Sequence, residues 1–360
     1  MEEMAWTSHQ TEVSNDNLWY VNNYGTLLCC FSLKEKRIIQ VENIPYSGNR
    51  SELLYSNILA VDNYLILVPA NAFYVILYNI NSREFITIGL NLNPKSYNMF
   101  CGCERWENKL FLIPYNVNFV ISIDLNTLEL KKECDLAAEL CEDGFNTVFR
   151  GCYALSCNRI YFLSNYENRV WCYNMEENKI SSELICEKKI KCTAIATNND
   201  KIFIIDENSD VHILGLNLEY KGKTKNKYKK REMFNFIDGI RINDNIYFFQ
   251  AEGDKIIKYN YIKQIILEQN IGLVMRVSLL NSSGDNIYGF DISRKRLFEY
   301  NCNKASFKYY NTALKLNENE AVLYMQNNLN TYNVVKECEH GFDTLNIFIK
   351  SITGSVMKKL

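Results

Sequence analysis

Cysteine and histidine are the residue types through which this chain could bind a metal. It has 13 cysteines but only three histidines, His9, His212 and His340, among 360 residues. Cys101 and Cys103 flank one glycine, yet no second cysteine pair and no histidine lies near them in sequence, which is unlike a structural zinc site. Buried thiols of a strand explain the pair adequately. We therefore predict neither a metal nor another cofactor.

Carboxylates are the other groups that could carry a reaction. A glycosidase needs two of them facing one another across the substrate, one acting as general acid. Asp and Glu together number 42, but nothing in the sequence fixes a pair at a working separation. The serine-hydrolase elbow, zinc-protease, P-loop and dinucleotide glycine patterns are all absent. The sequence names no reaction and favours a non-catalytic protein.

A run of basic residues occupies positions 221–231, where seven of eleven residues are Lys or Arg. One interpretation is a mobile loop for an acidic partner or nucleic acid. The other is an outer strand whose lysines protect an exposed sheet edge. A net charge of −2 and a pI near 6.1 give no general reason to expect nucleic acid. The basic residues are Lys221, Lys223, Lys225, Lys227, Lys229, Lys230 and Arg231.

The N-terminal sequence and the cysteines bear on where the protein acts. The first ten residues, MEEMAWTSHQ, contain two acids and no apolar core, so they do not resemble a secretory signal. No uninterrupted apolar run is long enough to span a membrane. Several cysteines lie inside apolar runs, as is typical of reduced, buried thiols. We expect a cytoplasmic protein.

A repeat organises most of the chain. An apolar residue recurs at intervals of 47, 45, 50, 42, 44 and 41 residues. Thirteen residues later comes an apolar or aromatic residue followed by a small polar one, as in Tyr78-Asn79, and seven residues beyond it another apolar residue, as at Phe85. In the fifth copy the second landmark, Leu216-Asn217, is offset by fourteen. The seven apolar anchors are Leu18, Leu65, Leu110, Ile160, Ile202, Ile246 and Ile287.

Each repeat predicts four short strands joined by tight turns. A pair rich in Asp and Asn, such as Asp62-Asn63, precedes each anchor, and these residues tolerate the positive φ of a tight hairpin. Small residues prevail nine positions before the anchors, where seven first strands crowded around one axis would require them. These positions hold His9, Ser56, Cys101, Gly151, Thr193, Ile237 and Ser278.

Together these features predict an all-β fold, a seven-bladed β-propeller of four-stranded antiparallel blades over residues 1–310. Six or eight blades are alternatives, as is another all-β arrangement such as stacked sandwiches. Residues 311–360 do not repeat the pattern, and we expect a closing strand at 321–325 and a short C-terminal helix at 341–350. One or two helical turns are expected at 135–142.

The second half of the repeat resembles that of the kelch propellers. Residues 78–85, Tyr-Asn-Ile-Asn-Ser-Arg-Glu-Phe, place an aromatic, a turn with Ser and a second aromatic at kelch spacing, and residues 123–130 are similar. The chain thus resembles kelch-type propellers and the related central domain of galactose oxidase, although the kelch glycine doublet is absent. The resemblance implies architecture only. Copper chemistry is not implied, because the three histidines form no ligand pair.

Loops joining the second and third strands of propeller blades lie on one face around the axis, where ligands commonly bind. Blades two to four place aromatics in these loops, and blades five to seven place carboxylates. Such a face suits a protein or peptide partner with basic groups; the alternative is that these loops are merely polar. The candidates are Tyr24, Phe73, Tyr115, Tyr166, Asp206, Glu207, Asp210, Glu252, Asp254 and Asp291.

A non-catalytic binding or scaffolding module is the function that these patterns favour. One alternative is a lyase- or glycosidase-type enzyme that acts on a carbohydrate or small molecule at the channel mouth. Another is a propeller that supplies specificity to a separately encoded enzyme. Nucleic acid is not expected as a partner.

Overall fold

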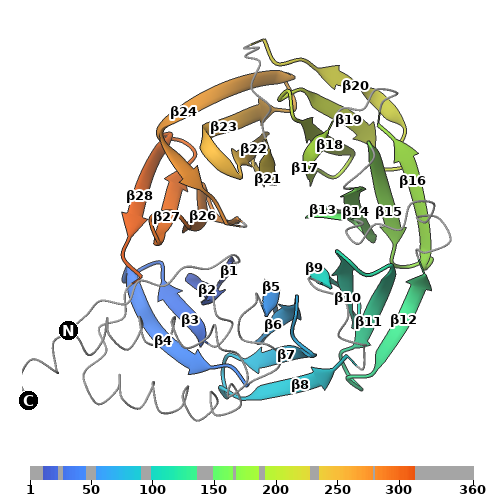
Figure 1. The fold of residues 1–360 in the computed structure, drawn as a ribbon, viewed down its shortest axis with the longest axis vertical. Helices are drawn as coiled ribbons and strands as arrows, with labels where there is room; N and C mark the ends of the chain where they lie inside the picture. The colour runs from blue at the N-terminus through green and yellow to red at the C-terminus, as the bar shows by residue number, and fades with distance from the viewer. Residues whose placement is uncertain are drawn as a thin grey trace, which may run out of the picture. The chain divides into compact units, whose positions relative to one another are not determined.

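The computed structural model describes residues 11–22, 27–45, 54–90, 99–135, 149–164, 168–185, 191–227, 235–278 and 280–312. These residues form 28 β-strands and no α-helix. A helix capable of crossing a membrane is accordingly not found among them. The strands make seven four-stranded antiparallel sheets, each from one continuous segment. Figure 1 shows the sheets around a ring, with the first strand of each nearest the axis. The predicted seven-bladed propeller is confirmed.

The first four blades use residues 11–184. Blade one comprises β1 (Thr11–Ser14), β2 (Asn17–Val21), β3 (Leu27–Ser32) and β4 (Arg37–Asn43). Blade two comprises β5 (Tyr55–Val61), β6 (Tyr64–Pro69), β7 (Tyr74–Asn79) and β8 (Phe85–Gly89). Blade three comprises β9 (Phe100–Trp106), β10 (Lys109–Pro114), β11 (Phe119–Asp124) and β12 (Leu130–Asp135). Blade four comprises β13 (Phe149–Ser156), β14 (Arg159–Ser164), β15 (Arg169–Asn174) and β16 (Lys179–Leu184).

The last three blades follow the same order. Blade five comprises β17 (Cys192–Thr197), β18 (Lys201–Asp206), β19 (Val211–Gly215) and β20 (Tyr220–Thr224). Blade six comprises β21 (Phe236–Ile242), β22 (Asn245–Gln250), β23 (Glu252–Asn260) and β24 (Ile265–Arg276). Blade seven comprises β25 (Asn281–Ser283), β26 (Asn286–Asp291), β27 (Arg296–Asn301) and β28 (Ser306–Tyr310). The predicted strand at 321–325 and the predicted helices at 135–142 and 341–350 lie almost wholly outside the described residues.

The sequence repeat is a ladder of cross-strand apolar neighbours. In blade two, Leu65 of β6 pairs with Tyr78 of β7, which pairs with Phe85 of β8. The same three-strand ladder runs through Leu110, Ile123 and Leu130 in blade three. Burial of the seven anchors, none more than 2% exposed, supplies much of the apolar area that stabilises each blade. The spacing is fixed because hairpin partners must stay opposite one another.

Blade five departs from the predicted spacing. Ile202 pairs with Leu214, and β19 ends at Gly215. The proposed landmark Leu216-Asn217 therefore lies in the turn after the strand, and that assignment was wrong. A shorter hairpin between β18 and β19 explains the change, because it brings the cross-strand partner one residue earlier than in the other blades.

The small polar residue after each aromatic caps the turn into the outer strand. Asn79 Oδ1 accepts hydrogen bonds from the backbone N–H groups of Asn81 and Ser82, both at 2.9 Å. Asp124 and Asn174 do the same in blades three and four. Four residues after the capping position the backbone is left-handed in six blades. Those residues are Lys36, Arg83, Leu128, Asn178, Gln264 and Ala305.

Asn79→Ala is expected to lower the free energy of unfolding by about 1 kcal/mol, because two turn N–H groups lose their acceptor. Urea unfolding followed by tryptophan fluorescence measures it. Asn81→Ala, in the same turn, is the matched control and should change stability by less than about 0.5 kcal/mol. Equal effects of the two variants would contradict the capping role.

Small residues nine positions before the anchors occupy β-bulges of the first strands. The register of β5, β9, β17 and β21 shifts at Ser56, Cys101, Thr193 and Ile237, so each is the extra residue of a bulge. Three of them donate to a carbonyl of the second strand. The pairs are Ser56 Oγ to Val68 O at 3.4 Å, Cys101 Sγ to Ile113 O at 3.7 Å and Thr193 Oγ1 to Ile205 O at 3.3 Å. These hydrogen bonds are a further role for small residues at these positions, and the expected crowding at the axis stays a prediction.

The predicted Asp and Asn pairs do lie in the hairpins between first and second strands, but the strained residue is often the one before them. Asp62 has a φ of 53° as predicted, whereas Glu107, Cys157 and Asn243 take the left-handed conformation in blades three, four and six. The turn needs one residue of positive φ, and its exact place depends on hairpin length.

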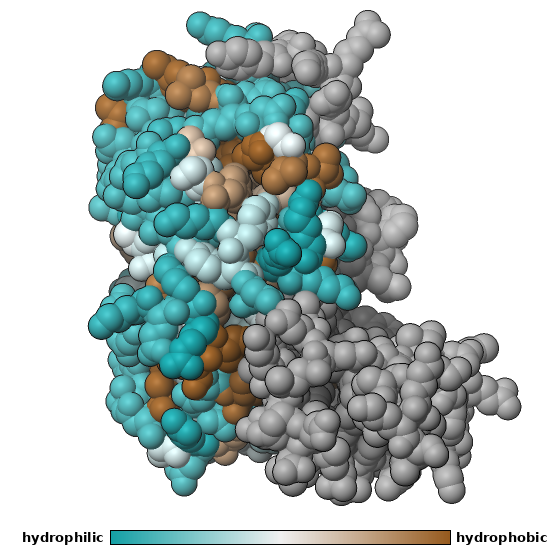
Figure 2. Space-filling view, turned by 90° about the vertical axis from the view of Figure 1, so that its left-hand side faces the viewer, coloured by the Kyte–Doolittle hydropathy of each residue, from teal (hydrophilic) through white to brown (hydrophobic). Residues whose placement is uncertain are grey.

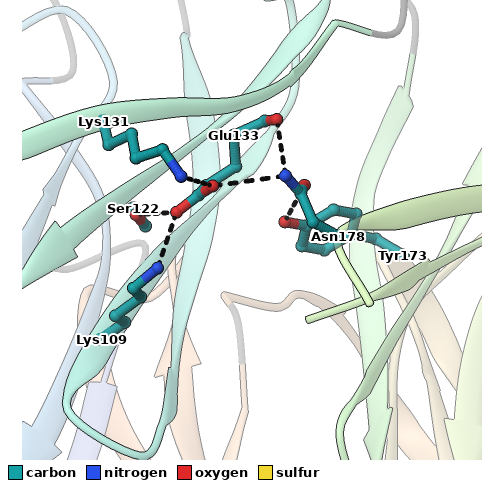
Figure 3. Close-up of polar contacts among 6 residues, drawn as sticks. All are labelled: Lys109, Ser122, Lys131, Glu133, Tyr173 and Asn178. Atoms are coloured by element: carbon teal, nitrogen blue, oxygen red, sulfur yellow. Dashed lines mark hydrogen bonds and ion pairs between the residues drawn. The ribbon is translucent and has the colours of Figure 1, made fainter. Parts of the chain in front are cut away.

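Glu133, whose carboxylate is buried, connects blades three and four at the rim. Glu133, whose side chain is 4% exposed, accepts hydrogen bonds from Lys109 at 3.0 Å, Lys131 at 2.8 Å and Ser122 at 2.7 Å. Asn178 of blade four donates to the Glu133 backbone carbonyl at 3.0 Å (Figure 3). Burial acts to raise the pKa of Glu133, but these donors hold it below its usual value. The charge is therefore stable inside the rim.

Among the described residues, blades one and seven meet through side-chain contacts, and neither sheet includes a strand of the other. Tyr20 packs edge-on against Phe290 with ring centroids 4.9 Å apart. Lys36 pairs with Glu299 at 3.1 Å. Among the described strands, none is shared between the first and the last blade.

Candidate functional site

Six polar residues lie on the first strands, which are the strands nearest the axis of the ring, and together we call them the axial cluster. All six are half-buried, so they combine partial desolvation with access to solvent. Six blades contribute one member each, because the innermost strands converge there (Figure 1). The axial cluster consists of Glu12, Asn57, Glu104, Tyr153, Asp238 and Asn281.

Glu12 joins blade one to both of its neighbours. Its Oε1 accepts a hydrogen bond from the Ala60 N–H of blade two at 3.1 Å. Its Oε2 accepts one from the Asn281 amide of blade seven at 2.7 Å. Both carboxyl oxygens are therefore held in position. This arrangement places one carboxyl group at the closing junction of the ring.

Tyr153 of blade four reaches across blade three to blade two. Asn57 Nδ2 donates to Tyr153 Oη at 3.3 Å and to the Cys101 carbonyl at 3.4 Å. The tyrosine ring lies over Gly102, where an added Cβ would stand 2.3 Å from the ring edge. Glu104, two residues along the same strand, also has a hydrogen bond with Tyr153. Glycine at 102 is what lets these side chains meet.

Asp238 adds a carboxyl from blade six. The Gly239 N–H donates to its Oδ1 at 2.8 Å. Asp238 directly follows the bulge residue of β21 in the sequence. The negative charge of Asp238 contributes to a raised pKa of Tyr153, as does that of Glu104. The three carboxyls of Glu12, Glu104 and Asp238 are thus close enough to influence a common region of the axis.

Burial raises the pKa of all three axial carboxyls. The pKa is about 7 for Glu12, about 8 for Glu104 and about 6 for Asp238. The charge of Glu12 adds to the effect of burial at Glu104. Within the described ranges no lysine or arginine forms an ion pair with any of the three. At neutral pH the axis therefore holds carboxyl groups that a bound cation would ionise.

Among the described loop candidates, Phe73, Tyr115, Glu207 and Asp210 lie between second and third strands, whereas Asp206 and Asp291 end second strands and Glu252 and Asp254 lie in β23. Their environments differ. Asp206 and Asp291 are fully buried, and Asp210 is 5% exposed. Phe73 is 42% exposed, and Glu252 is also exposed. Half-buried positions hold Tyr115, Glu207 and Asp254. Tyr24 and Tyr166 lie outside the described residues.

The buried loop carboxylates have partners inside the protein. Asp206 Oδ2 lies 2.9 Å from His212 Nε2, and its Oδ1 accepts from two N–H groups of its own loop. Asp210 pairs with Lys223 at 3.0 Å, and Asp291 pairs with Arg294 at 2.6 Å. These groups shape the loops and leave little capacity for a ligand.

The described part of the basic run forms the edge strand of blade five. Lys221 and Lys223 lie in β20 and pair with Glu219 at 2.9 Å and with Asp210 at 3.0 Å. Lys225 and Lys227 follow it and are exposed. This placement agrees with the interpretation of lysines that protect a sheet edge. The remaining members, Lys229, Lys230 and Arg231, lie outside the described residues.

The axial carboxyls were not among the sequence candidates, although a signal existed. Glu12, Glu104 and Asn281 each lie six residues before an anchor, and Asn57 and Asp238 lie eight before. A first strand alternates its side chains, so positions six and eight before the anchor face the same side. Polar residues at these two positions were the available signal.

The part of the chain that the structure describes holds no group of three or more His, Cys, Asp and Glu side chains arranged to bind a metal ion. Among the described cysteines Cys157 is exposed, whereas Cys101, Cys103 and Cys152 are buried. Proton transfer and charge pairing are the chemistry that the axial cluster supports.

No family model matches the chain, and no curated protein matches it in sequence. Solved structures share the fold. Virginiamycin B lyase from Staphylococcus aureus, in a catalytically inactive histidine-to-alanine variant with quinupristin, is 14% identical with a TM-score of 0.63 over 80% of this chain and 94% of that one. U3-55K is 12% identical with a TM-score of 0.58 over 80% and 89%. The designed Ika8 protein is 9% identical with a TM-score of 0.56 over 89% and 93%. At these identities the likeness defines a β-propeller and nothing finer.

Proposed function

We propose that the protein is a binding propeller that receives a cationic group of a protein or peptide partner at the axial cluster. The observation that carries this proposal is the set of three carboxyls, Glu12, Glu104 and Asp238, which no described lysine or arginine neutralises. A guanidinium or ammonium group placed among them would gain charge-assisted hydrogen bonds. Phe73 and Glu252 on the surrounding loops would contact the rest of the partner.

Proton release should accompany such binding. With pKa values of about 7 and 8, Glu12 and Glu104 are substantially protonated at neutral pH. A bound cation favours the ionised forms and lowers both pKa values. Affinity should therefore increase between pH 6 and pH 8. A cytoplasmic location stays a prediction from the sequence.

An enzyme is the second candidate, because a carboxyl with a pKa near 7 or 8 can donate a proton at neutral pH. Glu104 and Glu12 would be the general acids for a small-molecule substrate. Virginiamycin B lyase illustrates that an enzyme can be built on this fold. The binding module is preferred, because Glu12 is fixed by two hydrogen bonds at the ring junction.

Isothermal titration calorimetry with the synthetic peptide acetyl-Gly-Arg-Gly-Arg-Gly-amide tests the proposal. We expect saturable binding that is tighter at pH 8 than at pH 6, with a proton release revealed by buffers of different ionisation heat. Glu104→Gln should weaken binding about ten-fold, roughly 1.4 kcal/mol. Glu219→Gln, an exposed carboxylate on blade five, is the matched control and should bind like the wild type.

Two outcomes would count against the binding proposal. One is equal affinity for the analogous citrulline peptide, which keeps the shape but lacks the charge. The other is equal affinity of Glu104→Gln and the wild type. Release of nitrophenolate from a panel of nitrophenyl glycosides, lost in Glu104→Gln, would favour the enzyme instead.

A further inference from the structure

The outer strand of blade six is unlike the other outer strands. β24 has 12 residues, whereas β4, β8, β12, β16, β20 and β28 have five to seven. Its pairing with β23 shifts between Asn270 and Met275, so four residues protrude from the ladder. Gly272 allows this corner with a φ of 70°, and its N–H donates to Asn270 Oδ1 at 2.7 Å.

The protruding corner exposes aliphatic side chains on the rim. Leu273 is 45% exposed and Val274 is 62% exposed. Arg294 of blade seven donates to the Val274 carbonyl at 3.0 Å, so the corner is fixed to the neighbouring blade. Figure 2 views the molecule from the side on which Figure 1 places β24 and β28, and apolar side chains reach that surface in patches between polar ones.

A groove lies between this strand and blade seven, with a cavity volume of about 430 Å³. Tyr300, Phe307 and Tyr309 form an aromatic wall, opposite Ile271 and Leu273. Tyr300 donates to Gln269 Oε1 at 2.5 Å, which ties the two sides of the groove together. β24 is also the edge of its sheet, so one row of its backbone groups faces outward along the groove.

Two arginines lie near one wall of this groove. Burial raises the pKa of Tyr309, whereas the charges of Arg294 and Arg296 act to lower it, so both arginines lie near the phenol. Arg276 at the end of β24 and Arg296 are exposed. Asp291 is fully buried and paired with Arg294, and Glu252 is the cross-strand neighbour of Arg276. None of the described residues that line the groove is acidic.

We infer that this groove binds an extended segment of a partner protein in which carboxylates flank an aromatic or large aliphatic side chain. The apolar side chain fills the space between Leu273 and the aromatic wall. Its carboxylates pair with Arg296 and Arg276, whose guanidinium groups match carboxylate geometry. An extended segment also satisfies the outward-facing backbone of β24. This site lies on the rim and is separate from the axial cluster.

Fluorescence anisotropy with a labelled peptide, Ser-Asp-Glu-Phe-Asp-Leu-Glu-Ser, tests the inference on the full chain. We expect saturable binding that weakens at least ten-fold in Leu273→Ser and in Arg296→Gln. The matched controls are Leu184→Ser, 49% exposed on blade four, and Arg37→Gln, 70% exposed on blade one. Both controls should bind like the wild type.

Two further peptides and one further variant sharpen the test. A peptide with Lys in place of the acids and one with Ser in place of Phe and Leu should both fail to bind. Glu104→Gln should bind the acidic peptide normally, which separates this site from the axial one. The inference is overturned by equal binding of the lysine peptide, by equal losses in the control variants, or by no saturable binding up to millimolar protein.

Discussion

Glu104→Gln is expected to make the protein more stable at pH 8, by on the order of 3 kcal/mol, while changing its stability little at pH 4. The pKa of Glu104 is about 8 in the folded protein because of burial, against a usual value of 4.5. Between these two values the folded state holds a proton that the unfolded state has released. The stability contributed by this group is therefore complete below pH 4.5 and is lost as the pH rises towards 8. Glutamine keeps the neutral shape at every pH.

Urea unfolding at pH 4, 6 and 8 measures this effect. The wild type should lose stability across the series, and Glu104→Gln should lose markedly less. Glu219→Gln serves as the control, because this exposed side chain pairs with Lys221 on the surface and its pKa is not raised. Parallel pH profiles for the wild type and Glu104→Gln would show that Glu104 is ionised normally in the folded state.

Gly102→Ala is expected to lower the free energy of unfolding by about 2 kcal/mol. The new Cβ would stand 2.3 Å from the Tyr153 ring, so the ring must turn away. It then loses the hydrogen bonds with Asn57 and Glu104 that hold it over blade three. The same movement exposes Glu104 to water, so its pKa should fall towards the usual value.

A double-mutant cycle with Tyr153→Ala isolates this contact. In the Tyr153→Ala background the added methyl meets open space, and Gly102→Ala should cost less than about 0.5 kcal/mol. Thermal and urea unfolding of the four proteins give the coupling energy. If Gly102→Ala is equally costly in both backgrounds, the glycine is needed for a reason other than the tyrosine ring.

The blades were predictable because the residues that are cross-strand neighbours in a hairpin have a fixed separation in sequence. A three-strand ladder keeps residues such as Leu65, Tyr78 and Phe85 opposite one another, and any insertion between them would break the register. The spacings of thirteen and seven residues therefore follow directly from the pairing of the second, third and fourth strands. Blade five was misassigned in detail because its β18–β19 hairpin is shorter and no local residue marks the difference.

The axial cluster was not predictable in the same way, because its contacts join distant segments. Asn57 and Tyr153 lie 96 residues apart and meet only because blade three between them carries Gly102. Small residues at the first-strand landmark suggested a crowded axis, whereas they are bulge residues that bond the second strand. A bulge reverses the sheet face to which every later side chain of the strand points. Alternation that is counted across the bulge therefore assigns the axial positions to the wrong face.

The internal partners of the loop carboxylates were also not predictable from the sequence. Asp210 lies in a predicted loop and Asp206 and Asp291 lie at the strand ends beside such loops, but loop N–H groups, His212, Lys223 and Arg294 occupy them. Sequence shows that a carboxylate is in a loop and cannot show whether it points inward. Short polar loops often use Asp as an acceptor for their own backbone.

The closing of the ring by side chains has a consequence for how the protein is made. Glu12 and Asn281 lie 269 residues apart in the chain, so they meet only after the ribosome has produced nearly the whole propeller. Until then blade one and the most recently completed blade each present an uncovered apolar face, including Tyr20 on blade one. A nascent or truncated chain therefore carries a surface that chaperones and proteases recognise, and the finished ring hides it. The contact between blades one and seven is therefore the last contact between neighbouring described blades that can form during synthesis.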